Sequence, residues 1–172
     1  MKTALKTTLI ILVVLGVLGG AGYYAYNSFT APNEEEISQA AEQASEQLQQ
    51  GEDTQAPKSG ATSGAIGMEE GRFQTMLHQM THQKIEASKK VGAIEMTPER
   101  IDEMLKIAHA NENVYEHYEF YEKTLTAWEQ GDFSNSVNVH NSIWDWHNGT
   151  VGRAIGLLTP EQEAEFVERN FE

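Results

Sequence analysis

The chain contains no cysteine, so neither a disulfide nor a thiolate ligand or nucleophile is available to it. A lipoprotein is also excluded, because there is no cysteine to acylate. The sequence lacks a Gly-x-Ser-x-Gly elbow and a glycine-rich phosphate loop, which are common signatures of serine hydrolases and nucleotide-binding enzymes. We therefore expect a non-enzymatic protein without a cofactor, held together by the packing of its core alone.

Basic residues are scarce. The chain has 12 Lys and Arg against 26 Asp and Glu, which gives a formal net charge of −14. A surface of this sign disfavours binding to nucleic-acid phosphates and docking onto anionic lipid headgroups. We expect no nucleic-acid partner, and we expect most of the carboxylates to be solvated surface groups.

One long apolar stretch near the N-terminus contains no charged residue. Residues 7–26 (TTLIILVVLGVLGGAGYYAY) are long enough, at 1.5 Å per residue, to cross the roughly 30 Å hydrocarbon layer of a bilayer. Lys2 and Lys6 precede this run and acidic residues come after it. The positive-inside tendency then predicts a cytoplasmic tip at residues 1–6, a transmembrane anchor at 7–26 and a C-terminal domain outside the cell membrane.

The alternative for the same stretch is a cleaved signal peptide over residues 1–22. Two features favour a retained anchor. Tyr23, Tyr24 and Tyr26 occupy the position of an interfacial aromatic belt, and no clear Ala-x-Ala cleavage box follows the apolar core.

Residues 27–67 read as a flexible acidic stem. Residues 34–50 are rich in helix formers, but Ile37 and Leu48 are their only large apolar side chains, too few for a stripe that could bury itself. Residues 51–67 are rich in Gly, Ser and other small or polar residues, as flexible spacers are. We therefore expect the folded domain to cover residues 68–172.

The pattern of the domain predicts an all-α fold, a small bundle of about five short helices, with no convincing strand alternation. Thr97 followed by Pro98 is a helix start, and Thr159 with Gln162 forms a capping box. Apolar residues repeat at helical spacing between such signals. The expected helices are residues 68–90, 97–110, 113–130, 134–148 and 160–171.

Two segments carry a resemblance to a known family. They are MTHQKIEASKKVGAIEMTPERIDEML (residues 80–105) and WEQGDFSNSVNVHNSIWDWHNGTVGRAIGLLTPEQEAEFV (residues 128–167). The chain resembles an uncharacterised family, catalogued as a domain of unknown function, of N-terminally anchored proteins from Gram-positive endospore-forming bacteria. The resemblance implies an envelope protein and supplies neither an activity nor functional residues.

Histidines are the first candidates for chemistry. His78 and His82 stand four residues apart on one expected helix, the spacing at which two imidazoles can share a metal ion, and Glu86 could provide a third ligand. The competing interpretation, two exposed histidines four apart by chance, is favoured because the sequence fixes no third ligand. His140 and His147 are expected to be partly buried, hydrogen-bonded histidines at the edge of an aromatic core.

Phe120 and Trp146 are the second candidates, because each lies off the main apolar stripe of its helix and could be left over once the core is filled. Leftover aromatic side chains indicate a docking patch. The competing interpretation, that a further layer of helices covers them, is favoured for a small all-α domain. As a function, the sequence nevertheless predicts a membrane-anchored extracytoplasmic domain that binds an unknown envelope protein through Phe120 and Trp146. The alternative is a Zn or Cu domain that uses His78 and His82.

Overall fold

The computed structural model describes residues 34–52 and 64–172, and these residues form six helices and two short strands. The described part of the chain is therefore mostly helical, as predicted. The predicted cytoplasmic tip (residues 1–6) and transmembrane anchor (residues 7–26) lie outside the described residues. Within residues 34–52 and 64–172, no helix is both long and apolar enough to cross a membrane.

Four helices lie where the sequence places them: α4 (Pro98–Ala110), α5 (Tyr118–Glu129), α6 (Ser136–Trp146) and α7 (Pro160–Phe171). The predicted caps are confirmed. The side chain of Thr97 accepts a hydrogen bond from the backbone N–H of Arg100 at 3.2 Å, and Thr159 and Gln162 form a reciprocal capping box. Both devices satisfy N–H groups that the first turn of a helix leaves unpaired.

The helix predicted over residues 68–90 ends much earlier. α3 (Glu70–Thr81) is followed by strand β1 (Ile85–Ala87), which pairs antiparallel with β2 (Ala154–Leu157). The prediction of an all-α domain missed this sheet, because strands of three and four residues are too short to show alternation in a sequence. The pairing brings the segment before α7 back to the end of α3.

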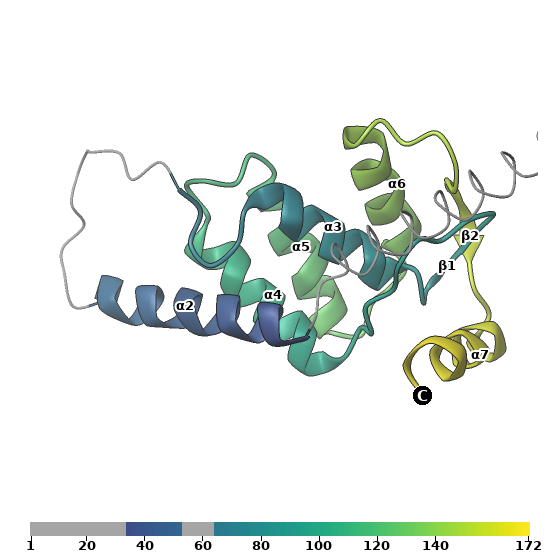
Figure 1. Cartoon of the computed structure of the whole chain (residues 1–172), viewed down its shortest axis with the longest axis horizontal. Coiled ribbons are helices and arrows are strands. Elements are labelled where there is room, and N and C mark those ends of the chain that lie inside the picture. The colour runs from purple at the N-terminus through teal and green to yellow at the C-terminus, as the bar shows by residue number, and fades with distance from the viewer. Residues whose placement is uncertain (1–33, 53–63) are drawn as a thin grey trace, which may run out of the picture. The chain divides into compact units, whose positions relative to one another are not determined.

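Part of the segment expected to be a flexible stem (residues 27–67) forms a helix, α2 (Glu34–Glu52). The folded part of the chain therefore includes residues that precede the start expected at Met68. The helix lies along α4 (Figure 1), and Ile37, Ala40, Ala41 and Ala44 are buried in the hydrophobic core. The expectation counted only large apolar residues. Small alanines bury well when two helices approach closely, so one isoleucine and three alanines suffice for a packed face.

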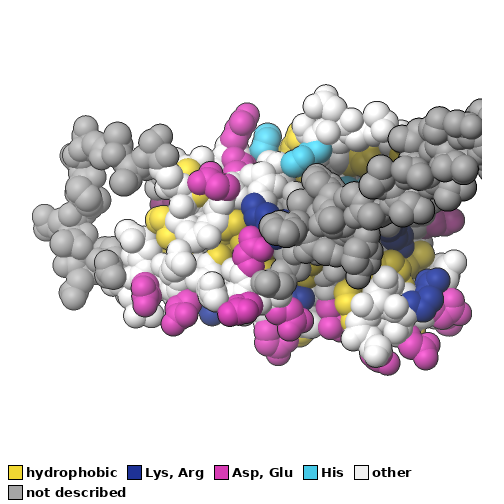
Figure 2. Space-filling model, in the orientation of Figure 1, with side chains coloured by type: hydrophobic (Ala, Val, Ile, Leu, Met, Phe, Trp, Pro, Cys, Tyr) yellow, Lys and Arg dark blue, Asp and Glu magenta, His cyan; other side chains and the backbone are white. Residues whose placement is uncertain are grey.

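The core lies between α2, α3, α4, α5 and α6. Its large members include Ile37 of α2, Phe73, Met76, Leu77 and Met80 of α3, Ile101, Met104 and Ile107 of α4, Tyr121, Leu125 and Trp128 of α5, and Val139 and Ile143 of α6. On the outside, Asp and Glu side chains are spread over the visible face (Figure 2), as expected for solvated carboxylates. α3 also packs against α6, and that contact positions the candidate site.

Candidate functional site

Three histidines meet where the end of α3 packs against α6. One ring nitrogen from each of His78, His82 and His140 lies within 4.8 Å of the others. The ring centroids of His78 and His140 are 4.0 Å apart, and those of His78 and His82 are 5.0 Å apart. We call these three residues the histidine cluster.

The cluster agrees only in part with the sequence analysis. His78 and His82 do come together, but His82 is 1% exposed, so the interpretation of this pair as exposed surface histidines was wrong. The third histidine is His140 from α6, whereas Glu86 is an exposed residue of β1 outside the cluster. His140 is buried and hydrogen-bonded, as expected. Its proximity to the pair depends on helix packing that no sequence spacing reveals. The same expectation was wrong on the burial of His147, which is exposed, although its Nε2 lies 2.8 Å from Oε1 of Gln74.

Backbone carbonyl groups fix the protonation of two of the rings. Nδ1 of His82 donates a hydrogen bond to the carbonyl oxygen of Gly92 at 2.7 Å, and Nε2 of His140 donates one to that of Gly152 at 3.1 Å. In the neutral rings, Nε2 of His82 and Nδ1 of His140 therefore hold the lone pairs. A ring that donates one N–H to a backbone carbonyl while its other nitrogen stays available is the usual arrangement of metal-binding histidines.

The remaining nitrogens are poorly supplied with hydrogen-bond donors. The hydroxyl of Thr81 lies 3.0 Å from Nδ1 of His140 and 2.5 Å from the carbonyl oxygen of His78, but it has only one proton to donate. Nδ1 of His78 is buried and has no hydrogen-bond partner among the described residues. Buried polar atoms are normally paired, so the cluster has unused capacity to bind a ligand.

The cluster is neutral at physiological pH. Burial lowers the pKa of the His78 imidazole to about 3, with repulsion from His140 and His82 as further causes, and burial lowers the pKa of His82 to about 4. Burial also lowers the pKa of His140, and the nearby Lys90 ammonium contributes to this. Metal ions bind the neutral form of imidazole, so the rings are in the form that binding requires.

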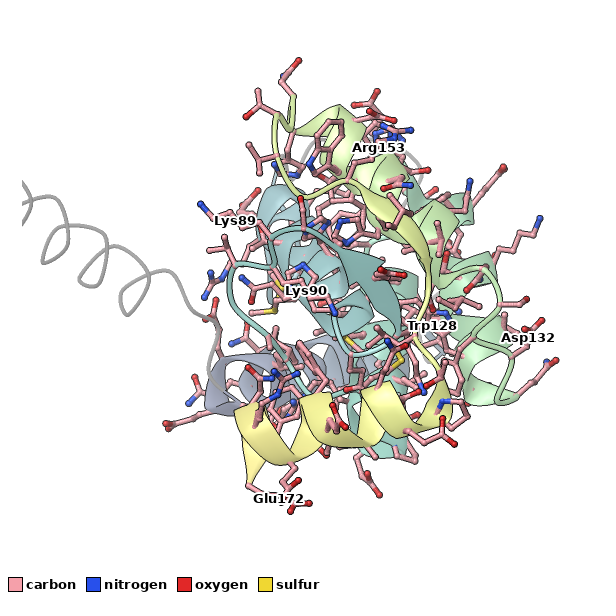
Figure 3. The ribbon with its side chains drawn as sticks, turned by 90° about the vertical axis from the view of Figure 1, so that its right-hand side faces the viewer. Lys89, Lys90, Trp128, Asp132, Arg153 and Glu172 are labelled. Carbon is pink, nitrogen blue, oxygen red and sulfur yellow. The ribbon has the colours of Figure 1, made fainter. Side chains whose placement is uncertain are left out.

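A pocket of about 250 Å³ lies beside the cluster. His78 and His82 line it together with Lys89, Val91, Trp144, Thr150, Val151 and Gly152. The indole N–H of Trp144 donates to the carbonyl oxygen of Val151 at 3.0 Å, which holds one wall. Figure 3 shows Lys89 and Lys90 on the segment that follows β1, and Nζ of Lys90 donates to the carbonyl oxygen of His82 at 2.7 Å.

The two predicted docking residues also come together. The rings of Phe120 on α5 and Trp146 on α6 lie 5.0 Å apart, and Trp146 stacks on His117 at 3.8 Å with an interplanar angle of 4°. All three side chains are half-buried. We call these three residues the aromatic patch. His117 and Phe120 also line a pocket of about 410 Å³ whose other walls are Glu112, Tyr115, Glu116, Tyr118 and Glu119.

The described residues thus define a mostly helical domain with a histidine cluster on one side of α6 and an aromatic patch between α5 and α6. A model of a family of unknown function (DUF6241) matches residues 77–168, more than half of the chain, and the chain belongs to that family. The predicted resemblance to an uncharacterised family is confirmed to that extent. No curated protein and no solved structure matches the chain. The matched segment contains both candidate sites, whereas α2 lies outside it.

Proposed function

We propose that this protein is a metal-binding domain of the cell envelope, which holds one divalent transition-metal ion through His78, His82 and His140. The observation that supports the proposal most is the approach of ring nitrogens from three histidines to within 4.8 Å of one another. In two of these rings, those of His82 and His140, one nitrogen is bonded to a backbone carbonyl. The proposal assigns binding, and no catalytic step, to this cluster.

The donor set selects the class of ion. Imidazole nitrogens suit Zn²⁺, Cu²⁺ and Ni²⁺, whereas Ca²⁺, Mg²⁺ and Mn²⁺ prefer carboxylate and carbonyl oxygens. The cluster contains no carboxylate among the described residues. We therefore propose zinc or copper as the bound ion, and the third histidine supplies what the pair predicted from sequence lacked.

Only a small adjustment is needed to close the site. A tetrahedral zinc ion with Zn–N bonds of about 2.0–2.1 Å holds its ligand nitrogens about 3.3 Å apart. The nitrogens of the cluster lie within 4.8 Å, so closure requires them to approach by about 1.5 Å or less. The rings of His78 and His140 are stacked at an interplanar angle of 27°, and because imidazole lone pairs lie in the ring plane, these rings must also turn before both can bind one ion.

We further propose that residues 7–26 anchor the protein in the cell membrane as a single span and that the domain works outside it. The supports are the uncharged apolar run, the two lysines that precede it and the acidic character of the rest of the chain. The resemblance to anchored proteins of Gram-positive endospore-forming bacteria points the same way.

Isothermal titration of the full chain in detergent with Zn²⁺ and Cu²⁺ tests the metal proposal. We expect one ion per chain with sub-micromolar affinity. Replacing His78, His82 or His140 by Ala should each lower the affinity by more than about tenfold. His109→Ala is the matched control, because His109 is a half-buried histidine of α4 outside the cluster. Equal affinity of His140→Ala and wild type would refute the three-histidine site.

A second function, binding of an envelope protein, is supported by the contact between Phe120 and Trp146. Each of these residues lies off the main apolar stripe of its own helix. A photo-crosslinking amino acid at position 120 should capture one partner in cells, whereas the same amino acid at Lys123, exposed on the same helix, should not. Equal capture from both positions would indicate contact without a specific patch.

A further inference from the structure

We propose that an ion held by the histidine cluster keeps one coordination position open toward the 250 Å³ pocket, and that this position takes a small anion as an exogenous ligand. The inference rests on the proposed metal-binding function and adds a ligand to it. It depends on the number of donors, the direction of the pocket and the charge around the cluster.

The number of protein donors leaves a position to fill. The cluster comprises three histidines, and no Asp, Glu or fourth histidine of the described residues joins it. Zinc and copper ions take at least four ligands, and zinc sites with three protein ligands keep the fourth position for water or another small molecule. A ligand from solvent must therefore complete the coordination.

The surroundings place that open position on the side of the pocket. Gly152, whose carbonyl oxygen accepts a hydrogen bond from the buried His140, lines the pocket together with His78 and His82. A water molecule occupies about 30 Å³ of liquid, so a pocket of about 250 Å³ holds a small ion with some water. Trp144 and Val151 form walls that limit the size of what enters.

The charge around the cluster selects an anion. Three neutral imidazoles leave the full charge of a divalent ion in place, and the cluster supplies no carboxylate from the described residues to balance it. Lys89 lines the pocket, and the ammonium group of Lys90 bonds to the backbone of His82. Both add positive charge beside the open position. An anion that binds there neutralises the ion and is attracted by Lys89.

Titration of the Cu²⁺-loaded full chain with azide tests the proposal. Azide bound to Cu²⁺ gives a ligand-to-metal charge-transfer band, so an open position should produce a saturable band with one azide per copper. Lys89→Gln should weaken azide binding several-fold without changing copper affinity. Arg153→Gln is the matched control, because Arg153 is an exposed cation paired with Asp145 and does not line the pocket. Val151→Trp, which narrows the pocket, should also weaken azide binding.

The outcomes separate the two proposals. Stoichiometric copper binding with a spectrum that azide leaves unchanged would overturn the open position while the metal site stands. Azide binding that is equal in wild type, Lys89→Gln and Val151→Trp would place the anion elsewhere and overturn the assignment to this pocket. Failure of copper to bind would overturn both the metal site and this inference.

Discussion

The carbonyl oxygen of Gly152 lies 3.1 Å from Nε2 of His140 and accepts its hydrogen bond, and Gly152 itself has a φ of +89°. The residue that fixes the tautomer of a buried histidine therefore depends on a backbone conformation that other residues rarely adopt. A Cβ atom at this position would also overlap the carbonyl oxygen of Lys89. The orientation of the His140 ring is thus tied to the presence of glycine at 152.

We predict that Gly152→Ala destabilises the domain by about 2–4 kcal/mol, because a positive φ costs about 1–2 kcal/mol and the clash with Lys89 adds to it. Gly131→Ala is the control. Gly131 has a φ of +79° but open space around its Cβ position, so only the backbone term applies and the cost should be about 1–2 kcal/mol. Urea denaturation of both variants measures the difference, and equal losses would show that the contact with Lys89 is unimportant.

Helix starts were predictable from the sequence because their determinants are local. Thr97 with Pro98 and Thr159 with Gln162 act within one helical turn, and the helices they begin lie where expected. The β1–β2 pair was not predictable, because the two segments are very short and their pairing partners are separated by most of the domain in the sequence.

Only part of the histidine cluster was predictable from the sequence, because only His78 and His82 are close to each other along the chain. The spacing of His78 and His82 places them on neighbouring turns of one helix, which the sequence shows directly. His140 joins them through the packing of α6 on α3, and its own sequence neighbourhood contains no metal-binding spacing. α2 was misjudged because a face made largely of alanines resembles a solvated helix when only large apolar residues are counted.

We predict that Ile37→Ala lowers the free energy of unfolding by about 2–4 kcal/mol, because the side chain is 1% exposed and its loss leaves a cavity between α2 and the core. Leu48→Ala on the same helix is the control, since Leu48 is 41% exposed and should cost about 0.5 kcal/mol or less. Chemical denaturation of the full chain compares them. Equal and small losses of unfolding free energy in both variants would mean that α2 does not contribute to the stability of the fold, as predicted for a flexible stem.

Acid should destabilise the metal-free domain over a pH range that is set by the pKa values of the histidine cluster. The folded pKa values of His78 and His82, about 3 and about 4, lie below the ordinary value of 6.5, so the unfolded chain binds more protons between these limits. The stabilising effect of the neutral rings is therefore complete above pH 6.5 and is lost as pH falls toward 4. Each histidine contributes a slope of up to about 1.4 kcal/mol per pH unit.

Urea midpoints measured in chelator at about pH 7.5, 6.0 and 5.0 test this window. His82→Asn, which keeps a donor for the Gly92 carbonyl but does not titrate, should show a shallower slope. The carboxylates of Glu36 and Glu70 also have lowered pKa values, but their effect begins only near their ordinary value of 4.5. A slope that is the same in wild type and His82→Asn would contradict the assignment to the cluster.

The proposed anchor predicts the orientation of the chain. A reporter that is active only outside the cell membrane, fused after Glu172, should give activity in the membrane fraction, because the proposed orientation keeps Lys2 and Lys6 on the cytoplasmic side. Replacing both lysines by Glu should reduce that activity. Release of the reporter into the medium would identify residues 7–26 as part of a cleaved signal peptide, and activity confined to the cytoplasm would reverse the orientation.

Metal binding should stabilise the fold, because the ion would join His78 and His82 at the end of α3 to His140 on α6 and the unfolded chain offers no such arrangement. At a free Zn²⁺ concentration about one hundred times the dissociation constant, the gain should be about 2.7 kcal/mol, and chelator should reverse it. Mg²⁺ at the same concentration should have no effect, because it prefers oxygen ligands. His140→Ala should reduce the gain by about 1.3 kcal/mol or more, since a loss of more than about tenfold in affinity lowers the ratio of free ion to dissociation constant from about one hundred to about ten or less. A Zn²⁺-dependent gain that is undiminished in His140→Ala would show that the pair binds without α6 and would refute the cluster as the site.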